Sequence, residues 1–380
     1  MTVKEAGLKA RVQGIDAVRG LAILGMFAAH VGPQPTYGSF GEVQDEPWAW
    51  LWVFDGRAAA TFAVLVGVSL TLLANGHSGA HSRARIATRA VLLILIGMIL
   101  AEFQTPILVI LVNTGLMMLI GMGALRAKTR TLVALTAAFL VIGPFARRWV
   151  VEMQDDGMYC PENTTCYTDT DGSMYGYEWQ EPRSFPLILR AFWGFYPVLV
   201  WMAYVFAGML VGRMALRSAT VLARLGAVGA VLAALGYGGG LALGGDWSHF
   251  GNGPGTWWAN VGPHSYSGFE TLGNLGVTLV VIAGCCAIAN ASRYLLVPFA
   301  AVGAMALTAY SVHIVAVWAM DNQPVYTTSQ APLLWFWGLG IVGCMVWRYT
   351  LGRGPLERAL HAASWRMAGA DAQGSSKLDS

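Results

Sequence analysis

The 380-residue chain is 56% hydrophobic and only 12% charged, with a mean hydropathy of +0.52. About a quarter of the residues of a soluble domain are charged, so this composition excludes a soluble globular protein and predicts an integral membrane protein. The formal net charge of +3 gives no reason to expect a nucleic-acid partner, because the basic residues lie between apolar segments and form no single patch.

Apolar runs of about 17 to 25 residues, the length that crosses a bilayer as a helix, recur along the chain. They predict an all-α, polytopic membrane bundle of about ten transmembrane helices, in which residues 1–350 form a single unit. The expected limits are 14–32, 57–75, 88–104, 106–124, 131–147, 191–212, 222–243, 270–290, 298–320 and 332–350.

The distribution of basic residues predicts the orientation, because lysine and arginine are enriched in cytoplasmic loops. With the N-terminus in the cytoplasm, all but five of the 24 lysines and arginines fall on the cytoplasmic side. We therefore expect both termini to be cytoplasmic. Extracytoplasmic loops are then expected at 33–54, 149–190 and 244–268.

The first expected helix carries Asp16, Arg19 and His30 within one narrow sector of its surface. Arg19 and His30 are separated by about 16 Å along the helix axis, so this polar face runs from one leaflet toward the other. Ionisable groups at membrane depth usually face the bundle interior and mark a functional path. A salt bridge between Asp16 and Arg19 at the interface, and an interfacial position for His30, remain alternatives.

The second expected helix begins with Asp55 and Arg57, at the level of His30. A carboxylate at this position could orient the histidine and raise its basicity, as acid–base catalysis requires. Asp55 could instead cap the N-terminus of the helix, and the two roles are compatible.

Later helices add more polar residues to the candidate site. They are Glu102, Asn113, Glu270, Asn274, Tyr310 and His313. Asn274 lies one turn beyond Glu270 and could fix its carboxylate. Capping or interfacial exposure remains an alternative for Glu270, and a hydrogen bond to a neighbouring helix remains one for His313. Most of these groups belong to the expected outer half of the helix bundle. In the inner half, Asp16, Arg19 and the basic loops could bind a cytoplasmic polyanion.

Cysteines and glycines have structural interpretations. Cys160 and Cys166 lie in the longest outer loop and predict a local disulfide in an oxidising compartment. No metal-ligand motif occurs, so no metal site is expected. Gly208 and Gly212 have GxxxG spacing and, like the glycine-rich run over 236–245, indicate close helix packing or a bend.

The C-terminal segment follows the last expected span. Residues 351–367 suit a short helix on the cytoplasmic membrane surface, since leucines gather on one side and basic residues lie elsewhere. Residues 368–380 are small and polar and are expected to be disordered.

Four segments in this order resemble the bacterial YeiB-like membrane proteins, and that family is similar to the transmembrane acyltransferases typified by heparan-α-glucosaminide N-acetyltransferase. The segments are RVQGIDAVRGLAILGMFAAH, FDGRAAATFAVLVGVSL, VGAMALTAYSVH and GPLERAL. They cover the beginning and the end of the chain, whereas the middle is matched only by hydropathy.

In the acetyltransferases a D-x-x-R-G signature opens the first helix, an asparagine lies near its outer end, and an active histidine precedes an aspartate at the next helix start. The residues here that match are Asp16, Arg19, Gly20 and Asp55. His30 stands at the asparagine position, and the loop over 32–54 contains no histidine. The resemblance therefore implies either that His30 has taken the role of the base or that acyl transfer is absent.

The resemblance implies a multi-pass acyltransferase of the bacterial plasma membrane. It would transfer an acyl group, typically acetyl, from cytoplasmic acyl-CoA to an extracytoplasmic sugar or glycolipid. Acyl-CoA (acetyl-CoA) would be a cosubstrate, with no tightly bound cofactor. In this hypothesis Arg19 binds the CoA end, His30 is the base oriented by Asp55, and His313 or Glu102 helps to bind the acceptor. The remaining expected substrate-binding residues are Asp16, Arg57, Asn113, Glu270, Asn274 and Tyr310.

The alternative is a membrane transporter or lipid-binding protein without catalytic activity, in which the same polar face forms a solute or proton path. The sequence offers no convincing inverted repeat and no pair of broken helices, which are the usual signs of alternating access.

Overall fold

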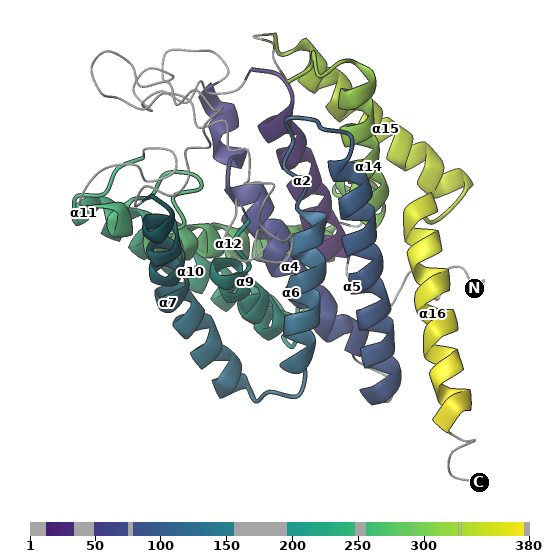
Figure 1. Cartoon of the computed structure of the whole chain (residues 1–380), viewed down its shortest axis with the longest axis horizontal. Helices are drawn as coiled ribbons and strands as arrows, with labels where there is room; N and C mark the ends of the chain where they lie inside the picture. Colours follow the sequence, from purple (N-terminus) through teal and green to yellow (C-terminus); the bar gives the residue numbers. More distant parts are fainter. Residues whose placement is uncertain are drawn as a thin grey trace.

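A computed structural model describes residues 13–33, 49–74, 79–155, 196–247, 256–292, 294–325, 327 and 329–375. Within these ranges the chain forms helices and no strand, so the all-α membrane fold is confirmed (Figure 1). The expected disulfide between Cys160 and Cys166 falls outside the described residues.

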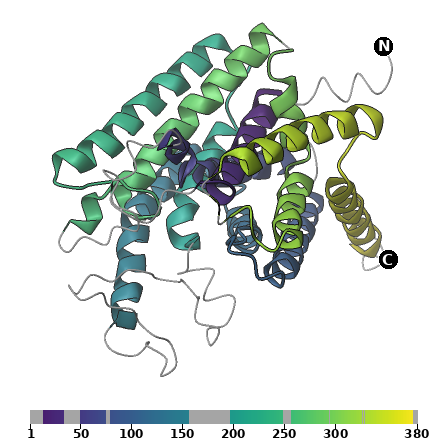
Figure 2. The ribbon, with the colours of Figure 1, turned by 90° about the horizontal axis from the view of Figure 1, so that it is seen from above.

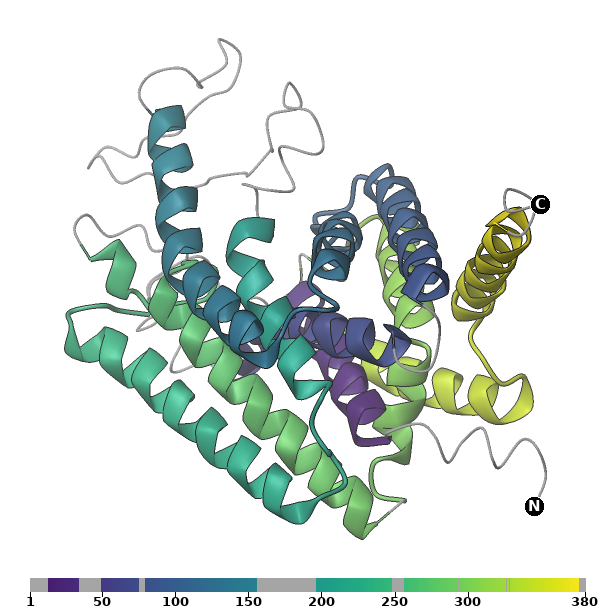
Figure 3. The same cartoon turned by 90° about the horizontal axis from the view of Figure 1, so that it is seen from below.

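The described residues form the following helices in chain order. They are α2 (Gln13–His30), the 3-10 helix η1 (Ala49–Phe54), α4 (Arg57–Ala74), α5 (Gly79–Ala101), α6 (Leu111–Gly123), α7 (Thr129–Asp155), α9 (Val198–Val211), α10 (Ala219–Ala233), the π-helix η2 (Ala234–Gly238), α11 (Gly239–Ala242), the 3-10 helix η4 (Trp257–Ala259), α12 (Gly268–Ala291), α13 (Val297–Ala304), α14 (Ala306–Ala319), α15 (Ala331–Thr350) and α16 (Pro355–Ser375). The long pair α10 and α12 lies on one side of the molecule and α15 and α16 on the other, with α2 between them (Figures 2 and 3).

Each of the ten expected segments contains a helix, but the helices differ in length. Among the described residues, six helices are long and apolar enough to cross a membrane, or seven if α13 and α14 form one bent span. The apolar helices α6 and α9 are shorter. The count of about ten spans and the cytoplasmic location of both termini therefore stay predictions.

The expected single helix over 298–320 is wrong, because the chain breaks between α13 and α14 and turns by 79°. Met305 at the break has φ −124° and ψ 29°, outside the helical region. Apolar residues continue through the break without a proline, so periodicity gives no sign of it. One interrupted helix is thus present among the described residues, whereas a pair of interrupted helices is the usual sign of alternating access.

Glycines bring four of the helices into close contact. Gly208 of α9 faces α4, where an added Cβ atom would lie only 1.9 Å from the backbone oxygen of Val64. At a second contact, a Cβ atom on Gly303 of α13 would lie 1.8 Å from the backbone oxygen of Asp16 in α2. The expected close packing at Gly208 is therefore confirmed, and small residues allow helix backbones to approach in this way within membranes.

The glycine-rich run shows the close helix packing that was one of its two expected features. Its central part forms the π-helix η2, a local widening of the helical turn. Gly236 packs against the backbone of Gly273 in α12, where a Cβ atom would lie 2.3 Å from the backbone nitrogen.

The C-terminal helix α16 packs along α5 at the edge of the bundle (Figure 1). The guanidinium of Arg85 in α5 lies 4.3 Å from the ring centre of Trp365, and Arg89 Nε donates to Ser364 Oγ at 3.4 Å. The helix continues to Ser375, beyond the expected boundary at 367. These contacts attach the end of the chain to the bundle.

Replacing Gly208 by alanine should destabilise the protein, because the methyl group would overlap the α4 backbone, which cannot move away independently. Overpacking of this kind costs about 1–3 kcal/mol. We expect a lower apparent Tm in detergent. The matched control is Gly338→Ala in α15, where a Cβ atom meets nothing within 4 Å; equal Tm values for the two variants would contradict the packing argument.

Candidate functional site

Two clusters of polar side chains lie at opposite ends of α2. We call the first the arginine pocket, which surrounds Arg19. The second, the histidine cluster, consists of His30, Asp55, His264 and His313, with the side chains that hold them. Because both lie along one helix, α2 links them in the way that its polar face predicts.

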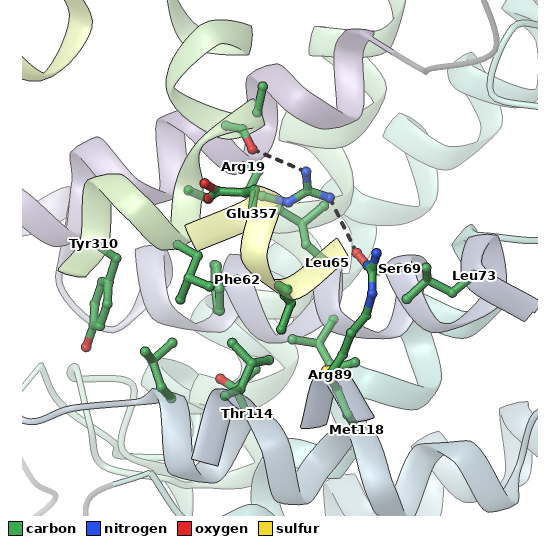
Figure 4. A pocket seen from close by; sticks show the side chains of 18 of the residues that line it. Arg19, Phe62, Leu65, Ser69, Leu73, Arg89, Thr114, Met118, Tyr310 and Glu357 are labelled. Atoms are coloured by element: carbon green, nitrogen blue, oxygen red, sulfur yellow. Dashed lines mark hydrogen bonds between the residues drawn. The ribbon is translucent and has the colours of Figure 1, made fainter. Parts of the chain in front are cut away.

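The arginine pocket is a cavity of about 340 Å³ between α2, α4, α5, α6, α16 and the break between α13 and α14 (Figure 4). Its polar lining consists of Arg19, Ser69, Arg89, Thr114, Tyr310, Arg353, Glu357 and His361. Its apolar lining includes Phe62, Leu65, Val66, Leu73, Leu93, Leu111, Met118, Leu307 and Leu360. Three arginines against one carboxylate make this lining cationic, which favours an anionic ligand.

Arg19 is held by several partners at the wall of the pocket. Its Nη1 atom donates to Asp16 Oδ1 at 2.9 Å and to the backbone oxygen of Gly303 at 3.3 Å. Its Nη2 atom donates to Ser69 Oγ at 3.4 Å (Figure 4). The salt bridge between Asp16 and Arg19 is therefore present, and Arg19 lines the pocket as well.

Glu357 of α16 binds the beginning of α14. Its Oε1 atom accepts the backbone N–H of Thr308 at 3.0 Å, and Oε2 accepts the Thr308 hydroxyl at 2.5 Å. A carboxylate is stabilised there because the N-terminus of a helix carries partial positive charge and unpaired N–H groups. A residue of α16 thus lines the pocket and binds α14 at the same time.

His361, one turn beyond Glu357, reports the electrostatic character of the pocket mouth. Burial lowers its pKa below the usual value, and the nearby charges of Arg353, Arg89 and Arg85 lower it further. After burial, the positive potential of these arginines is the second cause of this direction, and the same potential would attract phosphate groups.

At the other end of α2, His30 and His313 form a stacked pair. The two rings are nearly parallel, at 4°, and His30 Nδ1 shares a hydrogen bond with His313 Nε2 at 3.2 Å. His313 is buried, and its Nδ1 atom donates to the backbone oxygen of Tyr310. The two histidines, 283 positions apart in the chain, therefore meet as members of one cluster.

The histidine that contacts Asp55 is His264, a residue absent from the sequence-based candidates. His264 Nε2 lies 3.2 Å from Asp55 Oδ1, and its Nδ1 lies 3.2 Å from the hydroxyl of Tyr266. Asp55 thus contacts a histidine in addition to the one that the sequence led us to expect. Asp55 and His264 still act electrostatically on His30. The only sequence signal for His264 was a histidine in an expected outer loop, shortly before Glu270.

Glu270 holds the segment that presents His264. Its carboxylate accepts the backbone N–H groups of His264 at 3.0 Å and Tyr266 at 2.6 Å. Ser265 Oγ and Asn274 Nδ2 donate to it as well, at 3.2 and 3.1 Å. Both His264 and Tyr266 have positive φ, 58° and 55°, a conformation that is costly for residues other than glycine. Glu270 is only 4% exposed, which excludes interfacial exposure as its explanation.

Arg57 connects the start of α4 with the glycine-rich helix. Its Nε atom donates to the Tyr237 hydroxyl at 2.9 Å, and its guanidinium lies 4.6 Å from the ring centre of Trp52. Tyr237 in turn donates to Asn274 Oδ1 at 2.6 Å. Arg57 and Asn274 are therefore parts of the polar network around Glu270.

The remaining candidates have other positions. Asn113 Nδ2 of α6 donates at 2.7 Å to the backbone oxygen of Tyr196, which lies just before α9, and both residues are buried. Glu102 is exposed just after α5 and makes no side-chain hydrogen bond to any residue that the structure describes. Over the same described ranges, no group of three or more histidine, cysteine, aspartate or glutamate side chains could hold a metal ion.

Comparison with known proteins connects these residues to a family of enzymes. The family model for the catalytic region of heparan-alpha-glucosaminide N-acetyltransferase matches residues 11–238. The match includes α2 with Arg19 and His30, Asp55 in the turn before α4, and the middle of the chain up to the π-helix. The segments that carry His264, His313 and Glu357 follow the matched region. No curated protein matches the chain.

Replacing Glu270 by glutamine should loosen the segment around His264. An amide keeps one acceptor oxygen but turns an NH2 group toward backbone N–H donors, and an unsatisfied buried donor costs about 1–3 kcal/mol. We expect a lower apparent Tm and faster proteolysis within 260–267. Asp321→Asn, the same chemical change on an exposed side chain, is the control; an unchanged Tm for both variants would refute the role of Glu270.

Proposed function

Because the chain belongs to the family of heparan-alpha-glucosaminide N-acetyltransferase catalytic domains, we propose that it is a transmembrane acyltransferase of the bacterial plasma membrane. It transfers an acyl group, in the first instance acetyl, from cytoplasmic acyl-CoA to a hydroxyl or amine of an extracytoplasmic glycan or glycolipid. The observation that carries this proposal is the arginine pocket, which extends from a cationic mouth to Tyr310, three residues before His313.

The pocket matches the chemistry of a CoA thioester. Arg89 and Arg353 supply positive charge for phosphate groups, and arginine is suited to them because its planar fork binds oxygens in pairs. Beyond the mouth the walls of the pocket are mainly apolar, which suits the less polar arm of acyl-CoA. We place the mouth on the cytoplasmic side, as the distribution of basic residues predicts.

The inner end of the pocket approaches the histidine cluster through Tyr310. Its hydroxyl accepts the backbone N–H of Ile110 at 3.2 Å, and its ring centre lies 5.0 Å from that of His313. The hydroxyl hydrogen has no acceptor among the residues that the structure describes. It can therefore be donated in a hydrogen bond to the carbonyl oxygen of the acyl-CoA thioester. A hydrogen bond there would stabilise negative charge on that oxygen as the acceptor attacks.

His30 is the base of the proposed reaction. It takes a proton from the acceptor hydroxyl or amine while the acceptor oxygen or nitrogen forms a bond to the thioester carbonyl carbon. The carbon–sulfur bond then breaks, and the CoA thiolate receives the proton, so that the products are the acylated acceptor and free CoA. The carboxylate of Asp55 stabilises the positive charge that His30 carries between the two steps.

A transporter is the second candidate, and the broken span α13–α14 favours it because broken helices often form solute sites in transporters. A transporter has no need to recognise the CoA moiety or to release its thiol. Binding of acetyl-CoA to the purified protein, followed by release of free thiol when glucosamine is supplied as a probe acceptor, separates the two functions.

Replacing Arg89 by glutamine should weaken acetyl-CoA binding about tenfold or more, because a hydrogen bond to a charged group contributes about 1.5–3 kcal/mol. Titration calorimetry of the detergent-solubilised protein measures the change in Kd, and the difference should shrink at high salt. Arg224→Gln removes an exposed arginine of α10 outside the pocket and serves as the control. Equal losses in both variants would exclude a specific donor site.

Replacing His30 by glutamine should lower kcat for acetyl transfer to glucosamine about 10²–10⁴-fold, since glutamine cannot accept the proton. The Kd for acetyl-CoA should stay close to that of the unmodified protein, because His30 does not line the pocket. If the variant transfers acetyl at the original rate, His30 is not the base.

A further inference from the structure

From the hydrogen bonds of the stacked histidine pair we infer that His313 is a positioning residue, which holds His30 in the tautomer protonated at Nδ1. The Nε2 atom of His30 is then the proton-accepting atom of the cluster. The functional consequence rests on the proposed acyl transfer, whereas the tautomer itself can be measured without it.

The assignment starts from a backbone carbonyl, which can only accept a hydrogen bond. His313 Nδ1 contacts the backbone oxygen of Tyr310, so this nitrogen carries a hydrogen atom. A neutral imidazole has one donor and one acceptor nitrogen, and His313 Nε2 is therefore the acceptor. His30 Nδ1 lies 3.2 Å from that atom and must donate to it. In neutral His30, the lone pair consequently remains on Nε2.

Burial keeps His313 neutral and its orientation fixed. The side chain is only 2% exposed, and burying a charged imidazole without a charged partner is costly. Phe27, one turn before His30 on α2, lies 4.7 Å from the His313 ring, and the Tyr310 ring lies 5.0 Å away. His313 therefore presents its acceptor nitrogen to His30 in one direction.

This arrangement lets His30 take up a proton without rearrangement. Protonation at Nε2 leaves the hydrogen on Nδ1 in place, so the bond to His313 persists in both charge states of His30. A base that keeps its hydrogen bond through the proton transfer loses no orientation during the reaction.

His264 differs in the use of its ring nitrogens. Its Nε2 atom contacts Asp55 and its Nδ1 atom contacts the Tyr266 hydroxyl, so both are engaged. His30 Nε2, in contrast, has no hydrogen-bond partner among the described residues, and the side chain is only half-buried. Of the three histidines, His30 is therefore the one with a nitrogen open to a substrate.

The tautomer can be measured by nitrogen NMR of the full-length protein labelled with ¹⁵N-histidine, with His30→Gln used to assign the His30 signals. We expect a protonated Nδ1 and an unprotonated Nε2 in neutral His30. The opposite pattern in the unmodified protein would overturn the inference. Because this measurement needs no His313 variant, it does not depend on how such variants fold.

Two substitutions of His313 test its effect on His30. His313→Leu removes the acceptor, so both tautomers of His30 should appear and kcat with glucosamine should fall about 10²-fold, while the Kd for acetyl-CoA stays unchanged. His313→Gln supplies an amide oxygen that can accept from His30 Nδ1, and it should restore the Nδ1-protonated form and most of the rate. A leucine variant with the original tautomer would overturn the inference.

The same measurements separate this inference from the proposed function. If the unmodified protein has the expected tautomer but releases no thiol from acetyl-CoA with any acceptor, acyl transfer is refuted and the positioning role of His313 stands. If transfer occurs while His30 is protonated at Nε2, the function stands and the inference fails.

Discussion

Two charged side chains stabilise the break between α13 and α14. Each of them binds one of the two helix ends, where the break interrupts the backbone hydrogen bonds. Arg19 donates to the carbonyl of Gly303 near the end of α13, and Glu357 accepts the N–H of Thr308 near the start of α14. In a membrane such backbone groups have no water to bind, and leaving them unpaired is costly. Each charge has the sign that the helix dipole favours, so the bend is stabilised at both ends.

The arginine pocket and the histidine cluster both follow from this bend. Residues at the break, among them Ala304 and Leu307, form one wall of the pocket. The new direction of α14 brings Tyr310 to the inner end of the pocket and His313 onto the ring of His30. A straight helix would not give α14 this direction. A single change in chain direction therefore connects the arginine pocket with the groups proposed for proton transfer.

The sequence predicted what depends on one helix and missed what depends on tertiary contacts. The spacing of Asp16, Arg19 and His30 indicated a polar face, and the structure has groups at both of its ends. The break escaped prediction because apolar residues continue through it and its stabilising carboxylate lies about fifty positions later. The contact of His264 with Asp55 depends on backbone conformations that buried Glu270 stabilises, which no local pattern encodes.

The arginine pocket combines the beginning and the end of the chain, since Arg19 belongs to α2 and Glu357 and His361 belong to α16. During synthesis the ribosome makes α2 well before α16. Until α16 is made, the start of α14 lacks the carboxylate that binds it. The nascent chain can therefore insert most of its helices while the arginine pocket is still incomplete. A chain that stops before α16 gains membrane helices without gaining the pocket.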